Sequence, residues 1–244
     1  MEPAEYDYMF QLEDSLWWYV GQRRITEVLL RRNVPPSSRP LQVLDAGCGT
    51  GGALKQLEGF GQVTAFDFAP KAAELYLTRQ KGRISVASTD AIPFADASFD
   101  LVTSFDVLSQ IDTADTALHE LARVLRPGGI LFVRVPAFQA LHGPHDVTLH
   151  TKHRFSAPEL AARINKAGLR TVETTYANTL LFPVAVARRL LAKLTGIGKD
   201  ESDVRAVPAP LNAALGAVLT VEAMAIRRFR LPFGLSVIAL ARKP

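Results

Sequence analysis

The chain has 244 residues, of which 48% are hydrophobic, so it can bury a full core in one large domain with elaborations. Its net charge of +4 comes from arginine pairs spread among acidic residues, without a lysine-rich tail, and no nucleic-acid partner is expected. The single cysteine, Cys48, excludes an internal disulfide, and the N-terminus lacks the basic and apolar regions of a secretory signal. A cytoplasmic protein is expected.

Strand and helix patterns alternate along the first half of the chain. A helical segment is predicted at 15–33, and apolar runs with strand character begin near positions 41, 62, 83, 99 and 129. Further helices are predicted at 52–58, 70–81 and 113–125, the last ended by the Pro-Gly-Gly that follows Arg126. This alternation predicts a doubly wound α/β fold, with a mostly parallel sheet covered by helices on both faces.

The first predicted strand runs into the sequence VLDAGCGTGG. Gly47, Gly49 and Gly52 satisfy the pattern GxGxxG, in which glycines let the backbone turn sharply and approach a ligand at the start of a helix. Asp67 ends the next strand, where dinucleotide enzymes place a ribose-binding acid. A nucleotide-like ligand is predicted, but this motif alone does not separate NAD from an adenosyl ligand.

The charge at this turn helps to separate the two ligands. A pyrophosphate favours backbone N–H groups without a nearby carboxylate, whereas the methionine end of S-adenosylmethionine carries an ammonium and a sulfonium that favour an acid. Asp45, just before Gly47, supplies that negative charge. The local alternative is that Asp45 caps the loop by bonding to its own backbone.

Four blocks in order resemble the motifs of class I S-adenosylmethionine-dependent methyltransferases, in the broad type-11 group that acts on small molecules and lipids. They are VLDAGCGTGG, VTAFDFAP, STDAIPFADASFDLV and ELARVLRPGGILFVRVP, and they cover about 41–136. The resemblance implies a Rossmann-like sheet with the strand order 3-2-1-4-5-7-6. It also implies an enzyme that moves a methyl group from S-adenosyl-L-methionine, leaving S-adenosyl-L-homocysteine, to an oxygen or nitrogen of a small-molecule or lipid-linked acceptor.

The resemblance also assigns residues to the cofactor. In it, Asp67 accepts both ribose hydroxyls, the Asp90 side chain and the Ala91 backbone read the adenine edge, and the glycines pass under the methionyl group. A purely structural role is the alternative for three of these residues. Asp67 and Asp90 end strands, where turn-forming acids are common, and Phe105 is also suited to the core. The implied cofactor residues are Asp45, Gly47, Gly49, Gly51, Asp67, Phe68, Asp90, Ala91 and Phe105.

The N-terminal sequence LWWYVGQRR is similar to an aromatic-plus-arginine opening in some of these enzymes, where an N-terminal helix closes over the cofactor. Residues 1–38 are therefore expected to form a helical lid, with Arg23 paired to the methionine carboxylate. The alternative is a helix that packs Trp17 on the sheet and leaves Arg23 in solvent.

Four of the five histidines lie in the sequence HGPHDVTLHTKH, at 142–153, directly after the fifth strand. Ligands bind at the carboxyl ends of parallel strands, so this loop is expected over the mouth of the acceptor pocket. His145 or His150 is the candidate general base, because histidine titrates near neutral pH, although a site without a catalytic histidine is equally compatible. No metal is expected, since the segment has no cysteine and methyl transfer needs none.

The last third of the chain is expected to complete the sheet and carry specificity. A helix capped at Ser156 and stopped at Gly168 precedes a sixth strand, and SVIALARKP forms the last strand, antiparallel beside the fifth. The core is thus assigned to 39–178 and 233–244. The helical insertion at 179–232 is far longer than a hairpin needs and is expected to roof the acceptor site.

The insertion combines apolar and basic side chains. Its two apolar stretches, at 180–187 and 211–226, fall short of the roughly 20 residues needed to cross a bilayer. Basic amphipathic helices are suited to an anionic membrane surface, which would place the protein peripherally at the inner membrane face. Packing on the domain or on a second subunit of a homodimer explains the pattern equally well. The residues are the stripe Leu180, Val184, Ala187, Leu191 and Leu194, and the bases Arg188, Arg189, Lys193, Arg227, Arg228 and Arg230.

Two alternatives to a methyltransferase remain open at this point. An NAD-dependent oxidoreductase fits the glycine pattern, but Asp45 and the blocks around Asp90 and Gly128 disfavour it. A non-catalytic partner subunit that binds an adenosyl ligand would keep the same fold and show no turnover.

Overall fold

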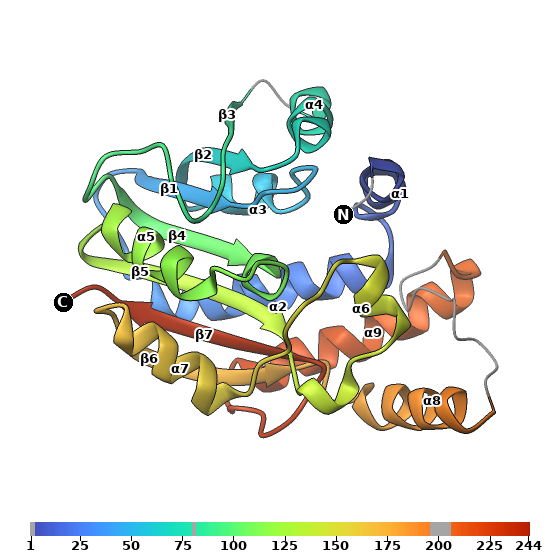
Figure 1. The fold of residues 1–244 in the computed structure, drawn as a ribbon. Coiled ribbons are helices and arrows are strands. Elements are labelled where there is room, and N and C mark those ends of the chain that lie inside the picture. The colour runs from blue at the N-terminus through green and yellow to red at the C-terminus, as the bar shows by residue number, and fades with distance from the viewer. Residues whose placement is uncertain (1–2, 80–81, 196–205) are drawn as a thin grey trace.

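The computed structural model describes residues 3–79, 82–195 and 206–244, without the side chains of 3–4, 144–145 and 190–195 (Figure 1). Seven strands form one sheet in the order β3-β2-β1-β4-β5-β7-β6, which confirms the predicted order. All neighbours are parallel except β7, which runs antiparallel between β5 and β6. The strands are β1 Leu41–Ala46, β2 Gly61–Asp67, β3 Arg83–Val86, β4 Phe99–Phe105, β5 Leu125–Pro136, β6 Arg170–Ala177 and β7 Ser236–Arg242.

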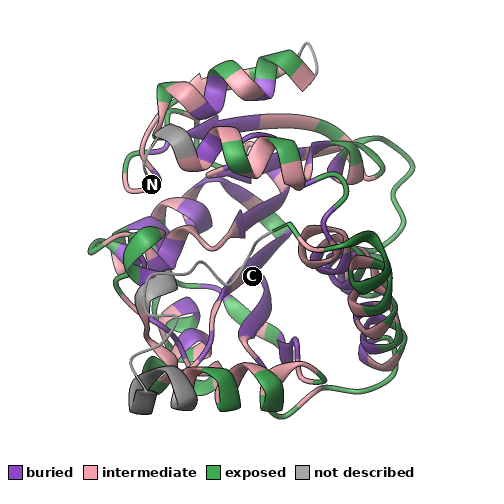
Figure 2. Ribbon diagram, turned by 90° about the vertical axis from the view of Figure 1, so that its right-hand side faces the viewer, coloured by how far each residue is buried: buried purple, intermediate pink, exposed green. Residues whose placement is uncertain are grey.

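Helices cover both faces of the sheet. Figure 1 shows α5 and α7 on one face and α2 and α9 on the other, and Figure 2 shows the buried strands between these layers. The helices are α1 Pro3–Leu12, α2 Trp17–Asn33, α3 Leu54–Glu58, α4 Pro70–Arg79, α5 Ala114–Val124, α6 Pro144–Thr148, α7 Ala157–Lys166, α8 Phe182–Thr195 and α9 Ala209–Ile226.

The central strands are apolar on both sides because each face of the sheet has its own core. In β4, Leu101 packs into the cluster shared with α2 and α9, whereas its neighbour Val102 packs into the cluster shared with α5 and α7. Leu131 and Phe132 divide between the same two clusters in β5. Strands buried on both faces are expected to read as continuous apolar runs, and this explains the pattern seen in the sequence.

The structure differs from the sequence prediction at a few elements. The N-terminal helix α1 was not predicted as a separate element, and the histidine segment contains the short helix α6. Strand β5 begins at Leu125 instead of after the Pro-Gly-Gly, because Leu125 already pairs with Phe99 and Gly128 N donates to the carbonyl of Lys243. The cap of α7 is as predicted, since Ser156 Oγ accepts from Glu159 N at 3.4 Å.

Helices α8 and α9 lie between β6 and β7, in the segment predicted as an insertion. Helix α9 runs alongside α2, with Gly21 against the Leu219 side chain and the Trp17 amide donating to Asn212 Oδ1 at 2.8 Å. At 18 residues, α9 is one described helix that is long and apolar enough to cross a membrane by length and composition.

Candidate active site

The glycine turn after β1 depends on backbone that other residues adopt with difficulty. Gly47, Gly49 and Gly51 have φ angles of 78°, 54° and 84°, in the left-handed region that favours glycine. A Cβ atom on Gly47 would also lie 2.2 Å from Val107 Cγ2. The turn is therefore closely packed, and the three glycines place its backbone N–H groups at the carboxyl end of β1.

Asp67 lies at the end of β2 and bonds directly to this turn. Its Oδ2 accepts from Gly49 N at 2.8 Å and its Oδ1 accepts from Ala69 N at 3.0 Å. The side chain is 8% exposed; burial raises the pKa of this carboxyl, while the two backbone N–H bonds lower it. The two backbone N–H groups fix the direction of this carboxylate at the end of β2, and Tyr6 lies beside it.

Asp45 lies beneath the turn and is 1% exposed. Its Oδ1 accepts from Thr103 Oγ1 at 2.8 Å, so the side chain bonds to β4 and not to its own backbone. Burial raises its pKa to about 7, the Thr103 hydroxyl opposes this rise, and the nearby Asp67 adds to it. Asp45 therefore changes charge near neutral pH.

The raised pKa of Asp45 predicts a pH-dependent stability. Because the folded state holds the proton more tightly, the stabilisation is full below the ordinary value of 3.8 and is lost as pH rises through about 7. The Asp45→Asn variant should therefore gain stability relative to the unsubstituted chain between pH 4 and pH 8, by on the order of a few kcal/mol. Urea unfolding of both proteins at several pH values measures this difference. Parallel pH profiles would contradict it.

Asp90 lies in the turn that leads from β3 toward β4. Its Oδ1 accepts from Ser88 Oγ at 2.5 Å and its Oδ2 accepts from Thr113 Oγ1 at 2.9 Å, and these two hydroxyls lower its pKa. Ala91 N donates to the carbonyl of Ser88 at 3.2 Å, which closes the turn. The Asp90 carboxylate is thus ionised and fixed in direction.

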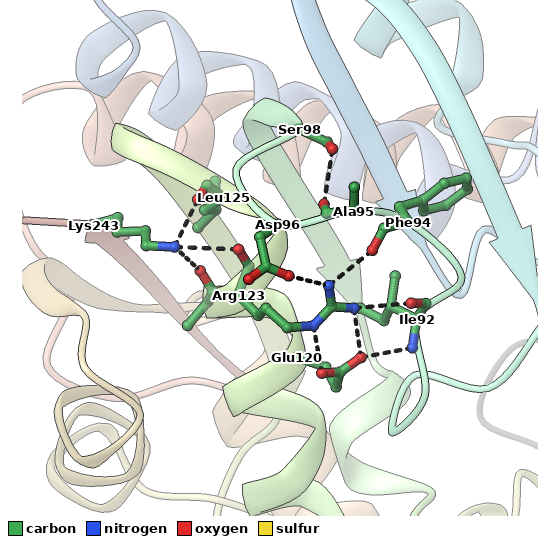
Figure 3. Close-up of polar contacts among 10 residues, drawn as sticks. Ile92, Phe94, Ala95, Asp96, Ser98, Glu120, Arg123, Leu125 and Lys243 are labelled. Carbon is green, nitrogen blue, oxygen red and sulfur yellow. Dashed lines mark hydrogen bonds and ion pairs between the residues drawn. The ribbon is translucent and has the colours of Figure 1, made fainter.

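Arg123, on α5, holds the loop that follows this turn (Figure 3). Its guanidinium donates to the carbonyls of Ile92 and Phe94 at 2.9 and 2.8 Å and to Asp96 at 2.7 Å. Glu120 binds the same guanidinium and accepts from Ile92 N at 2.9 Å. These carboxylates raise the pKa of Arg123, so the loop beside Asp90 and Ala91 is held by a permanent charge.

Helix α1 lies over the glycine turn. The Tyr6 hydroxyl lies beside Asp67, and burial together with the charge of Asp67 raises the pKa of this hydroxyl, while Met9 Cε lies 3.1 Å from the position that a Cβ atom on Gly49 would take. Glu13, which is 5% exposed, accepts from the Thr50 hydroxyl and from Arg79 Nη2 at 2.7 Å. Buried charged contacts therefore connect α1 to the turn and to α4.

Three of the predicted cofactor residues lie away from this cluster or are engaged elsewhere. Arg23 donates to the carbonyls of Glu13 at 2.6 Å and Asp14 at 3.4 Å, at the junction between α1 and α2. Phe68 is 78% exposed. The Phe105 ring packs on Phe132, with a centroid distance of 5.6 Å, and joins the core on the α2 side of the sheet.

The histidine segment begins after β5, at the carboxyl edge of the sheet. His142 Nε2 lies 3.0 Å from the carbonyl of Thr151, and His153 Nε2 lies 2.8 Å from Glu159 Oε1. His150 is exposed and has a φ of 55°, whereas the side chain of His145 lies outside the described residues. No group of three metal-ligating side chains gathers anywhere in the described part of the chain.

Sequence reasoning missed the residues that support the site. Glu13 and Arg79 meet across α1 and α4, and Arg123 reaches a loop far from it in sequence. A signal for Arg123 was present, because the acidic Glu120 precedes it by one helical turn and pre-orients it. Nothing comparable marks Glu13.

Comparison with known proteins gives a consistent result. Residues 44–133 match the protein family described as a methyltransferase domain. The chain is 34% identical over 185 residues to a malonyl-[acyl-carrier protein] O-methyltransferase of Enterobacter lignolyticus, covering 72% of this chain and 71% of that protein. It is 30% identical over 204 residues to the O-methyltransferase resE of Aspergillus sclerotiorum, covering 76% and 77%. The fold matches a chain of the complex between a Haloferax volcanii Trm112 methyltransferase activator and a putative methyltransferase, with a TM-score of 0.64, 23% identity and coverage of 99% and 94%.

The sheet order, the glycine turn and the ordered motifs define a methyltransferase fold. With relatives of 30% identity or more over more than two thirds of its length, the chain belongs to the class I S-adenosylmethionine-dependent methyltransferases. It is a methyltransferase enzyme, which excludes the nicotinamide-dependent and non-catalytic alternatives left open by the glycine pattern.

Proposed function

We propose that this methyltransferase transfers the methyl group to an oxygen atom of a small-molecule or lipid-linked acceptor. The observation that carries the proposal is the buried Asp67 carboxylate bonded to the glycine turn, at the edge of the sheet where ligands of this fold bind. The choice of oxygen rests on the two relatives, which are both named O-methyltransferases.

S-adenosylmethionine fits the residues around the turn. Asp67 would hold the ribose hydroxyls, and the Asp90 carboxylate with the Ala91 backbone would read the adenine edge. Burial raises the pKa of Asp45 to about 7, and a neighbouring ammonium, such as that of the methionine group, would favour its charged form. When bound, the cofactor supplies an activated methyl group on its sulfonium. The chain itself has to align the acceptor with that group and exclude water.

Residues 1–38 and the insertion at 179–232 are the parts suited to exclude water. Helix α1 already lies over the turn through Tyr6 and Glu13, and we assign it the role of a lid. Arg189, on α8, donates to the carbonyl of Leu141 in the histidine segment, so the insertion contacts the loop after β5. We assign the insertion the role of a roof over the acceptor.

The chemistry of the acceptor decides whether a histidine is needed. A hydroxyl must lose its proton, and His150 or His145 would take it. A carboxylate, such as the one that a malonyl group carries, is already ionised at neutral pH and needs no base. The two acceptor classes therefore predict different pH dependence for the same fold.

The experiment is transfer of labelled methyl from S-adenosylmethionine into an extract of the producing cells, separated into organic and aqueous phases. Label in the organic phase identifies a lipid acceptor, and label in the aqueous phase identifies a soluble one. Base-labile label indicates a methyl ester, whereas base-stable label indicates a methyl ether or an N-methyl group, which mass spectrometry of the product distinguishes. The absence of protein-dependent label on any oxygen acceptor would contradict the proposal.

For a hydroxyl acceptor, His150→Ala is expected to lower kcat by about 100-fold or more, whereas for a carboxylate acceptor kcat should change little. The matched control is His119→Ala, which removes an exposed histidine on α5. If kcat keeps its value in the His150 variant while the label is an ether, His150 is not the base.

A further inference from the structure

Helix α9 has two faces of different character. Its inner face packs along α2, and all its polar side chains lie there or at its margins and are bonded. Asn212 accepts from Trp17 N, Thr220 bonds to Arg24, and Glu222 is 1% exposed. The outer face carries only apolar side chains, namely Leu211, Ala213, Ala214, Ala217, Val221 and Met224.

This outer face is unusual for a helix facing water. A surface helix ordinarily places charged and polar residues on the side away from the core. Here Leu211, Val221 and Met224 are 47%, 52% and 59% exposed, and Glu222 is the only charged residue between 209 and 226. Phe229, which follows the helix, is 65% exposed as well.

The polar contacts of α9 exclude a membrane-spanning arrangement. Glu222 accepts from Asn178 N and from Leu180 N at 2.9 Å, and Arg32 of α2 donates to the carbonyl of Ile226 at 2.7 Å. Inserting α9 across a bilayer would break these contacts and leave a carboxyl group in hydrocarbon. The helix is thus anchored to the protein along its length of about 27 Å and can only lie along a surface.

Basic residues surround the end of the stripe. Arg227, Arg228 and Arg230 flank Phe229, and all three are exposed. Glu173 is buried and bonded to Arg32, and it also lies 3.9 Å from Arg230 Nε, so Arg227 and Arg228 are the bases of this group that contact no acid among the described residues. The exposed stripe carries no carboxylate, so a second copy that packs on it through the same surface would bring no acid to neutralise these arginines. The stripe therefore suits a partner that has both an apolar interior into which side chains can insert and a negatively charged surface.

We propose that this α9 stripe is a docking surface for an anionic phospholipid membrane. The apolar side chains enter the boundary between headgroups and acyl chains, and the arginines around Phe229 bind the lipid phosphates. The sequence suggested α8 and α9 together as basic helices. The side chains of Leu191, Lys193 and Leu194 on α8 lie outside the described residues, and the proposal rests on α9. The proposal concerns where the protein binds and does not depend on which molecule it methylates.

The experiment is co-sedimentation of the full chain with vesicles of phosphatidylcholine containing about one third phosphatidylglycerol, compared with pure phosphatidylcholine. We expect binding to the anionic vesicles at low salt, weaker binding at high salt, and little binding to the neutral ones. Met224→Glu and the double variant Arg227→Gln/Arg228→Gln should each lower the partition coefficient about 10-fold or more.

Matched controls carry the same changes on the opposite edge of the molecule. Leu77→Glu alters a 51% exposed residue on α4. Lys55→Gln/Arg83→Gln removes two charges, one on α3 and one on β3. Both control variants should bind vesicles like the unsubstituted protein. The proposal fails if the anionic vesicles do not bind, or if the controls lose binding equally. It also fails if the protein is a dimer that Met224→Glu dissociates, since a second copy then covers the stripe. Binding of the stripe to an acidic protein, without binding to vesicles, would overturn it as well.

Discussion

Replacing Asp67 with asparagine is expected to weaken S-adenosylmethionine binding by about 100-fold or more. The carboxylate accepts from Gly49 N and Ala69 N, so an asparagine amide would direct N–H groups toward one of these donors. It would also lose the charge that strengthens the contacts to two ribose hydroxyls, each worth about 1.5 to 3 kcal/mol. Isothermal titration calorimetry with S-adenosylmethionine and with S-adenosylhomocysteine measures the change.

The matched control for this prediction is Glu27→Gln, which neutralises a half-exposed carboxylate on α2 that pairs with Arg31. That variant should bind the cofactor normally. Thermal unfolding of both variants separates lost binding from lost folding. An Asp67→Asn protein that folds and binds the cofactor within a few-fold of the unsubstituted chain would remove Asp67 from the proposed site.

The second large effect is expected at Arg123. Lysine keeps the charge but loses the planar fork that binds the Ile92 and Phe94 carbonyls, Asp96 and Glu120 together. Arg123→Lys should therefore lower the free energy of unfolding by about 2 to 3 kcal/mol. It should also weaken cofactor binding roughly 10-fold, because the loop beside Asp90 loses its anchor.

Arg163→Lys serves as the control, since Arg163 bonds to Asp115 and Glu159 on the surface and does not touch this loop. Its effect on stability should stay below about 1 kcal/mol. The free energy of unfolding and the cofactor Kd of Arg123→Lys are measured separately, because they report different roles of Arg123. If Arg123→Lys destabilises the fold but leaves the cofactor Kd unchanged, Arg123 supports only the core and does not position the adenine turn.

Much of the fold was predictable because its signals are local. The apolar run around Leu101 is continuous because both faces of the sheet are covered. Such an unbroken run indicates a buried parallel strand without any long-range information. The glycine turn could be predicted equally well, because positive φ angles at Gly47 and Gly49 restrict those positions to very few residue types. The strand order required the resemblance to a known family.

The parts that sequence reasoning missed depend on contacts between distant segments. Helix α1 is short, and what places it is Tyr6 on Asp67 and Glu13 on Thr50, neither of which has a sequence pattern. Phe105 could not be assigned to ligand or core from its position, because both lie at the end of β4; the structure packs it on Phe132. The histidines share one loop, and the partners of two of them are nearby in the chain, Thr151 for His142 and Glu159 for His153, but no sequence pattern marks these contacts.

The contact between Tyr6 and Asp67 has a kinetic meaning if Asp67 holds the ribose. Asp67 already receives two backbone N–H groups and lies beside the Tyr6 hydroxyl, so two further hydroxyls would need the place that Tyr6 occupies. Cofactor and helix then compete for one carboxylate, and α1 must release Tyr6 each time product is exchanged for substrate. The buried Glu13–Arg79 pair resists that movement, so the pace of successive turnovers would be set by the departure of a helix and not by the transfer of the methyl group.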